Sequence, residues 1–278
     1  LDKDHLWNGW ILHNLGRLKI YQGRLRESLV NLTEALRIKI KNLGENNIDV
    51  AGTMVYLAYI YEQFGDLKTA EYFANASSNI WINFYGEGSE YHAYAAHNLI
   101  SLDLRLGNYK KSTELANKAI ELKTKHFGSN HPSLATSYNA LGNIHQMQQN
   151  FNEAIENYRK AEQIFLYIKD TSSVEYVFVI HNLGVCYMGL KQLESAEFYL
   201  NKALKLKSLS NGQDNIDFVS TLIHFSELLI LQNNFSEAEK HMILAKKYME
   251  ENRIIVNDNF LLLLSLFEKK ALKDNNIS

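Results

Sequence analysis

The sequence has very little proline and cysteine, with one residue of each type in 278 residues, and the cysteine is Cys186. Proline interrupts helices, so its near absence favours helices throughout the chain. One cysteine cannot form a disulfide within the chain, and the apolar segment from Phe260 to Leu264 is too short to span a membrane. With no signal-like start, these absences predict a cytoplasmic location and no membrane partner.

The sequence also lacks a dominant charge. Its 29 basic and 31 acidic residues give a formal net charge of -2. No overall field therefore draws the chain to phosphate backbones, and nucleic acid is not expected as a partner. The hydrophobic share of 46% is large enough for a substantial core. The chain begins at Leu1 rather than at methionine, which suggests a domain excised from a longer protein.

One pattern recurs along the chain with a step of 42 residues. Each unit has an apolar anchor, followed in most units by a small residue. Small residues also stand thirteen and twenty positions after each anchor, where they allow a second helix to lie close to its neighbours. A turn with glycine or asparagine, suited to a helix C-cap, separates the two helices of a unit. The anchors are Leu15, Leu57, Leu99, Leu141, Leu183 and Phe225.

This pattern predicts six repeats in residues 1–252, followed by a C-terminal capping helix and polar tail in residues 253–278. We assign Trp7 and Trp81 to the packing, and Lys202, Lys205 and Lys207 to solvated faces of second helices. The first helices are expected near residues 4–21, 46–63, 88–106, 131–148, 172–190 and 214–232. The second helices are expected near residues 24–41, 67–84, 109–126, 151–168, 193–208 and 235–251.

The small-residue positions, with the pairs Leu15-Gly16, Leu141-Gly142 and Leu183-Gly184, resemble the tetratricopeptide consensus. The 42-residue step and the segment FGSNHPSLATSYNALG, residues 127–142, are similar to the kinesin-light-chain subtype. The consensus tyrosine four residues after the anchor is kept only as Tyr61 and Tyr187. The resemblance implies an all-α fold, a right-handed α-solenoid of six helix-turn-helix units whose first helices line a concave face.

The resemblance further implies a protein-interaction module that binds a peptide or protein segment in its concave groove. His-Asn pairs recur every 84 residues at groove-facing positions, and an asparagine amide can donate and accept hydrogen bonds to a peptide backbone. Aromatic side chains can supply apolar anchors, and arginines can meet carboxylates. The candidate binding residues are Trp10, His13, Asn14, Arg17, Tyr56, Tyr59, Tyr94, His97, Asn98, Arg105, Asn139, Asn143, His181 and Asn182.

Other interpretations stay open at this stage. The candidate side chains can instead hydrogen-bond to neighbouring helices as part of the packing. The chain can also be a sensor or autoinhibitory arm of a larger signalling or immune protein, because relatives of this subtype occur beside nucleotide-binding ATPases and caspase-like proteases. Another domain of the parent protein would then be the partner.

Enzymatic chemistry is not expected from this sequence. Cys186 and His181 stand five residues apart on one predicted helix, so they point to different faces, and no third group orients them. A buried thiol is the preferred interpretation of Cys186. Neither a metal-ligand spacing nor a phosphate-binding loop is found, so we predict no cofactor and no metal.

Overall fold

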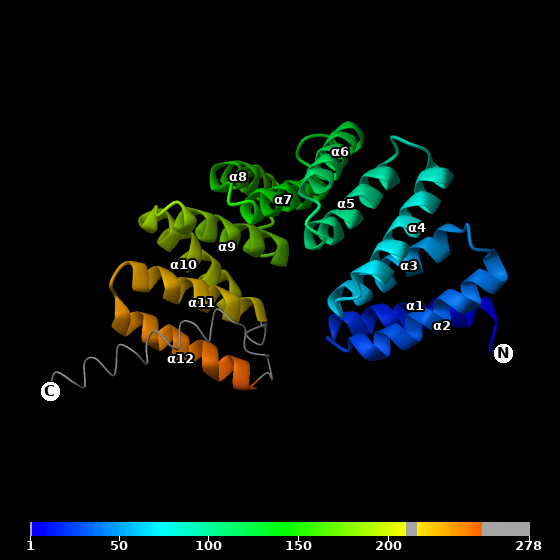
Figure 1. The fold of residues 1–278 in the computed structure, drawn as a ribbon, viewed down its shortest axis with the longest axis horizontal. Coiled ribbons are helices and arrows are strands. Elements are labelled where there is room, and N and C mark those ends of the chain that lie inside the picture. Colours follow the sequence, from blue (N-terminus) through cyan, green and yellow to red (C-terminus); the bar gives the residue numbers. More distant parts are fainter. Residues whose placement is uncertain (1, 210–215, 252–278) are drawn as a thin grey trace. The chain divides into compact units, whose positions relative to one another are not determined.

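The computed structural model describes residues 2–209 and 216–251, without the side chains of residues 90, 92–98, 209, 216, 217 and 251 (Figure 1). This part of the chain consists of twelve α-helices and contains no strand. The predicted capping helix and tail, residues 253–278, lie outside the described residues.

The helices follow the 42-residue step of the sequence, and every predicted helix boundary lies within two residues of the observed one. The predicted all-α solenoid of helix-turn-helix units is therefore confirmed. The first helices of the six units are α1 (Leu6–Tyr21), α3 (Ile48–Gln63), α5 (Glu90–Arg105), α7 (Pro132–Met147), α9 (Val174–Gly189) and α11 (Ile216–Leu231). The second helices are α2 (Leu25–Leu43), α4 (Leu67–Tyr85), α6 (Tyr109–Phe127), α8 (Phe151–Tyr167), α10 (Leu193–Leu209) and α12 (Phe235–Glu251).

The twelve helices divide between two compact units, Leu1–Ile144 and His145–Ser278, and α7 crosses the boundary. In the first unit the helices from α1 to α6 each pack against the next along the chain (Figure 1). The same holds in the second unit from α8 to α12. Most tertiary contacts are therefore made between neighbours in sequence, as expected for a repeat protein.

Small residues bring the helices close together at the positions that the pattern singled out. A Cβ atom on Gly16 would lie 2.5 Å from Leu32 Cγ, and one on Gly184 would lie 2.6 Å from Leu200 Cγ. The twelve small residues of the second helices are all at most 1% exposed. They are Ser28, Ala70, Ser112, Ala154, Ala196, Ala238, Ala35, Ser77, Ala119, Ala161, Ala203 and Ala245.

The turn within each unit has one residue in the left-handed backbone conformation, which caps the first helix. In the first unit Gly23 has a φ of 70°, its backbone N–H donates to Ile20 O, and Arg24 N–H donates to Lys19 O. This pair of bonds is a Schellman motif, which needs a left-handed residue at the cap. The predicted caps are confirmed, and two of them use residues other than glycine or asparagine, Gln149 and Lys191.

Two packing assignments made from the sequence are wrong. Trp7 is 60% exposed, because no described helix covers that side of α1. Lys207 is only 8% exposed, because its Nζ donates to Thr221 Oγ1 of α11 at 2.8 Å. Lys202 is partly buried, and its Nζ lies 3.1 Å from Glu162 Oε1. Of the lysines 202, 205 and 207 that were assigned to solvated faces, only Lys205 is exposed.

Candidate functional site

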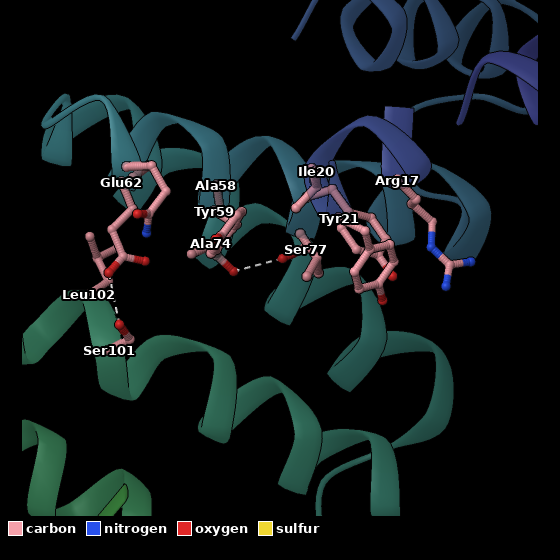
Figure 2. Close-up of a pocket in the computed structure, with 14 residues that line it drawn as sticks. Arg17, Ile20, Tyr21, Ala58, Tyr59, Glu62, Ala74, Ser77, Ser101 and Leu102 are labelled. Carbon is pink, nitrogen blue, oxygen red and sulfur yellow. Dashed lines mark hydrogen bonds between the residues drawn. The ribbon is translucent and has the colours of Figure 1, made fainter. Parts of the chain in front are cut away.

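A pocket of about 520 Å³ opens in the first unit between α1, α3, α4 and α5 (Figure 2). The helices meet there through the small residues of α4, which leave space that larger side chains would fill. The volume is within the range of roughly 300–1,000 Å³ found for ligand pockets. Its lining is Arg17, Ile20, Tyr21, Val55, Tyr56, Ala58, Tyr59, Glu62, Gln63, Ala70, Ala74, Ser77, Ser101 and Leu102.

One side of the pocket combines tyrosines with a cation. The guanidinium carbon of Arg17 lies 5.2 Å from the ring centroid of Tyr56, a cation–π contact. Tyr59 is 43% exposed and Tyr21 is 78% exposed, so both rings present area to a ligand. The Nε of Arg17 is buried and has no acceptor among the described residues. This side can therefore hold an apolar group and offer a hydrogen-bond donor.

The other side of the pocket is a polar network around Glu62. Ser101 donates a hydrogen bond to Glu62 Oε1 at 2.8 Å, as Figure 2 shows. Arg105 donates to the backbone carbonyl of Glu62 at 2.6 Å, and its Nη1 lies 3.7 Å from the Glu62 carboxylate. The network compensates the Glu62 charge, so Arg17 carries the unpaired charge among the pocket's described side chains.

Sequence reasoning missed the floor of the pocket. From the sequence, Ala70 and Ser77 were identified only as small residues that allow close helix packing. In the structure they line the pocket together with Ala58 and Ala74. The signal was present, since small residues on facing helices permit either close approach or an opening. Only the positions of α3 and α5 decide which of the two occurs.

His13, next to the pocket, is half-buried and contacts a buried threonine and lysine. Its Nδ1 lies 3.1 Å from Thr53 Oγ1, which also accepts a hydrogen bond from Lys39 Nζ at 3.0 Å. The His13 ring meets Tyr56 edge to face at 5.5 Å. Burial, then the nearby Lys39 and Arg17 charges, lower the pKa of His13 to about 4, so the imidazole is neutral at pH 7.

Similar contacts recur at the 84-residue interval. Lys123 Nζ donates to Ser137 Oγ at 2.8 Å, and burial lowers the pKa of Lys123 to about 8. In the second unit Lys207 and His181 both contact Thr221 Oγ1, at 2.8 and 2.9 Å. Burial, then His224 and Lys207, hold the pKa of His181 well below its usual value. The sequence showed the recurring histidines but not their lysine and hydroxyl partners.

The structure brings only some of the predicted binding residues together. Arg17, Tyr56 and Tyr59 line the pocket, with His13 and Arg105 at its edges. His181 is 8% exposed and contacts a buried threonine, so it offers little surface to a partner.

The remaining predicted residues lie elsewhere on the first helices. Trp10 is half-buried with its ring 5.2 Å from Trp7, and Asn14 is exposed on α1. Asn139, Asn143 and Asn182 are half-buried. The side chains of Tyr94, His97 and Asn98 lie outside the described part of the chain.

The one thiol is unsuited to nucleophilic chemistry. Cys186 is fully buried, as predicted, and burial raises its pKa to about 12. Its Sγ donates to Gln146 Oε1 at 3.5 Å. A protonated, inaccessible thiol is a packing group. Within the described residues no group of three or more His, Cys, Asp or Glu side chains is placed to hold a metal ion, and no helix is long and apolar enough to cross a membrane.

Comparison with known proteins agrees with this architecture. Sequence models of the tetratricopeptide repeat match residues 9–49, 49–125, 91–166 and 179–208. The chain belongs to the tetratricopeptide repeat family. This tetratricopeptide chain is also similar to kinesin light chains: it is 23% identical over 233 residues to Protein KINESIN LIGHT CHAIN-RELATED 1 of Arabidopsis thaliana. The match covers 82% of the chain but 37% of that relative.

Solved structures share the fold of this tetratricopeptide chain. BtubC (BKLC) from P. vanneervenii superposes with a TM-score of 0.67 at 20% identity, covering 84% of this chain and 94% of that one. PilW, a type IV pilus biogenesis factor, gives 0.62 at 15% identity, covering 92% and 98%. Such repeats serve in protein–protein interaction and are typically scaffolds without catalytic activity. At these identities the likeness describes the fold and does not identify a partner.

Proposed function

We propose that the chain binds a segment of another protein in the pocket between α1, α3, α4 and α5. The observation that carries this proposal is the pocket itself, because about 520 Å³ of space lies beside exposed tyrosine rings and a buried donor without an acceptor among the described residues. An apolar side chain of the ligand fills the space against Tyr56 and Tyr59. Arg17 then binds a carbonyl or carboxylate oxygen beside it.

The ligand is best bound as an extended segment. The pocket is open on the side of Tyr21 and Tyr59, so the backbone of the ligand can run past it while one side chain enters. The exposed amide of Asn14, on α1, can add hydrogen bonds to the backbone of the ligand. Asn98 and Asn182 stand at the matching positions of their own repeats, and their role in binding stays a prediction.

A matched pair of tyrosine variants tests this proposal. Peptides are selected from a random display library on the full chain, and their affinities are measured for Tyr59→Ala and Tyr72→Ala. Tyr72 is the control, since it is 66% exposed on α4 outside the pocket. We expect Tyr59→Ala to weaken binding about tenfold and Tyr72→Ala less than twofold, in line with roughly 1.4 kcal/mol for an anchor residue. Selection of no peptide, or equal losses in both variants, would contradict the proposal.

The second function, a sensor or autoinhibitory arm of a larger protein, stays a prediction. It concerns domains outside this chain, and the chain spans 37% of the length of the curated relative it matches. Tyr59→Ala introduced into the parent protein would separate the two, because an arm that contacts its own parent protein through another face would keep that contact in this variant.

A further inference from the structure

The pocket lies at a place that a side chain fills in other repeats. Gly16 faces Leu32, and Gly184 faces Leu200, because a Cβ atom on either glycine would lie 2.5 or 2.6 Å from the leucine Cγ. The corresponding pairs of the remaining repeats are Ala58 and Ala74, Ile100 and Ala116, Gly142 and Tyr158, and Ser226 and Met242. Only the second repeat has an alanine at both positions, so no side chain of its own fills the space beside Ala74.

The fourth repeat shows which side chain this position can hold. Tyr158 corresponds to Ala74, is fully buried, and donates from its hydroxyl to Gln146 Oε1 at 2.7 Å. Gln146 Oε1 also accepts from Cys186 Sγ of α9 at 3.5 Å. Gln146 corresponds to Glu62 of the second repeat. In the fourth repeat, an acceptor at the end of the first helix therefore receives a phenol from the second helix.

Glu62 keeps the acceptor of this arrangement but lacks the phenol. Its Oε1 accepts from Ser101 of α5 at 2.8 Å, while Ala74 of α4 has no group to donate. Among the described residues, none is found to donate a hydrogen bond to Glu62 Oε2. The Glu62 side chain is 12% exposed, so a further bond to it would form largely out of water, where hydrogen bonds are stronger.

The two ends of the pocket differ in hydrogen-bonding character. Figure 2 shows Glu62 at one end and Arg17 at the other, with Ala58 and Ala74 between them. Glu62 offers an acceptor, and the buried Arg17 Nε offers a donor. A tyrosine residue has the complementary groups in that order, namely a hydroxyl that donates, an apolar ring and a backbone carbonyl that accepts. A lysine fits less well, because Arg17 and Arg105 already place two positive charges near the one carboxylate.

We propose that the pocket binds a tyrosine side chain of the partner protein, with its ring beside Ala74 and its hydroxyl donating to Glu62. The ring takes the place that the Tyr158 ring takes in the fourth repeat. This inference rests on the proposed function and names the side chain that enters the pocket. Arg17 Nε then donates to a backbone carbonyl of the same ligand segment. A phenylalanine would fill the space but leave Glu62 without the added bond.

A pair of peptides tests the hydrogen bond to Glu62. A peptide selected on the full chain, whose binding is weakened by Tyr59→Ala, is compared with a copy in which phenylalanine replaces its tyrosine. We expect the phenylalanine peptide to bind about tenfold more weakly in fluorescence anisotropy, as for the loss of a bond to a charged group. Glu62→Met removes the acceptor and places there the residue type found at the corresponding Met188 of the fifth repeat. The two peptides should bind this variant equally.

Two further variants complete this experiment. Glu114→Met is the matched control, since Glu114 is an exposed carboxylate on α6 outside the pocket, and it should keep the tenfold difference. Ala58→Gly combined with Ala74→Tyr reproduces the residues of the fourth repeat, so that the introduced ring fills the pocket from within. This double variant should lose binding of the tyrosine peptide, whereas Asn79→Tyr, at an exposed position of α4 outside the pocket, should keep it.

The outcomes separate this inference from the proposed function. Peptides that depend on Tyr59 but contain no tyrosine would overturn the inference and leave the pocket as a binding site. A loss from tyrosine to phenylalanine that persists in Glu62→Met would overturn it in the same way. Selection of no peptide would contradict the proposed function itself and, with it, this inference.

Discussion

The two compact units build the same helix-turn-helix repeat with different residues at the turn. The first unit uses Gly23, Gly65 and Gly107, with φ between 70° and 80°. The second unit uses Gln149, Lys191 and Asn233, with φ between 58° and 62°. A left-handed conformation costs a residue with a Cβ atom roughly 1–2 kcal/mol. The packing of the two helices therefore dictates the backbone of the turn, and the local residue only adjusts the energy of that turn.

The units differ more at the recurring histidine. In the first unit His13 is half-buried and its ring touches Tyr56, which lines the pocket. In the second unit His181 is 8% exposed and its ring meets His224 at 5.1 Å. The histidine at one repeat position borders a pocket in the first unit and is enclosed in the second. The neighbouring repeat decides the role of such a residue.

The largest expected effect comes from removing a hydroxyl in the second unit. Thr221→Val takes away the group that contacts both Lys207 and His181 inside the protein. We expect a loss of about 2–3 kcal/mol in the free energy of unfolding, because buried polar groups lose a partner. Thr53→Val should cost less, since the half-buried His13 can bond to water in place of the hydroxyl, whereas His181 is 8% exposed. Urea denaturation of each variant of residues 1–278 measures both losses in the free energy of unfolding.

A double variant controls for the change of shape. In Lys207→Met with Thr221→Val both polar groups are replaced by apolar ones, so the double variant should be more stable than Thr221→Val alone. Additive losses in the double variant would show that the lysine–hydroxyl bond does not account for the cost.

The second expected effect is on the pH dependence of stability. Both histidines are neutral when folded, and an unfolded histidine binds a proton below a pKa of about 6.5. The unfolded state thus binds more protons as the pH falls from 7.5 to 5, and stability decreases in that window. One neutral histidine accounts for at most about 2 kcal/mol at pH 5.

Single substitutions separate the two units in this experiment. We expect His181→Gln to flatten the curve of unfolding free energy against pH more than His13→Gln does, because solvent screening reduces the contribution of the half-buried His13. The slope of the unfolding free energy against pH is obtained from urea denaturation at a series of pH values. Comparing slopes removes any change in stability that is the same at every pH. Parallel curves for His181→Gln and the wild type would contradict the prediction.

The smallest expected effect is at the turns. Lys191→Gly should stabilise the second unit by about 0.5–1 kcal/mol, since glycine removes the left-handed strain but adds freedom to the unfolded chain. Gly65→Ala should destabilise the first unit by a similar amount, because alanine introduces that strain. Thermal unfolding of both variants beside the wild type gives the two changes in stability. Changes of the same sign would mean that the backbone conformation at the turn does not explain the effect of these residues.

The sequence by itself determined the repeat. The 42-residue step, the small residues of the second helices and the turn positions predicted all twelve helices to within two residues. This was possible because each repeat packs mainly on its neighbours in sequence, so local pattern and tertiary contact carry the same information. The paired small residues predicted burial of Ala35 and Ser77 for the same reason.

Only the tertiary structure decided which side chains form a site. Arg17 and Tyr59 come from different helices, and the pocket between them depends on how far α3 and α5 stand apart above Ala74. The sequence placed Lys207 in solvent and Trp7 in the core, and the structure reverses both. A helical pattern shows which face a residue occupies, but whether another helix covers that face depends on the neighbouring repeat.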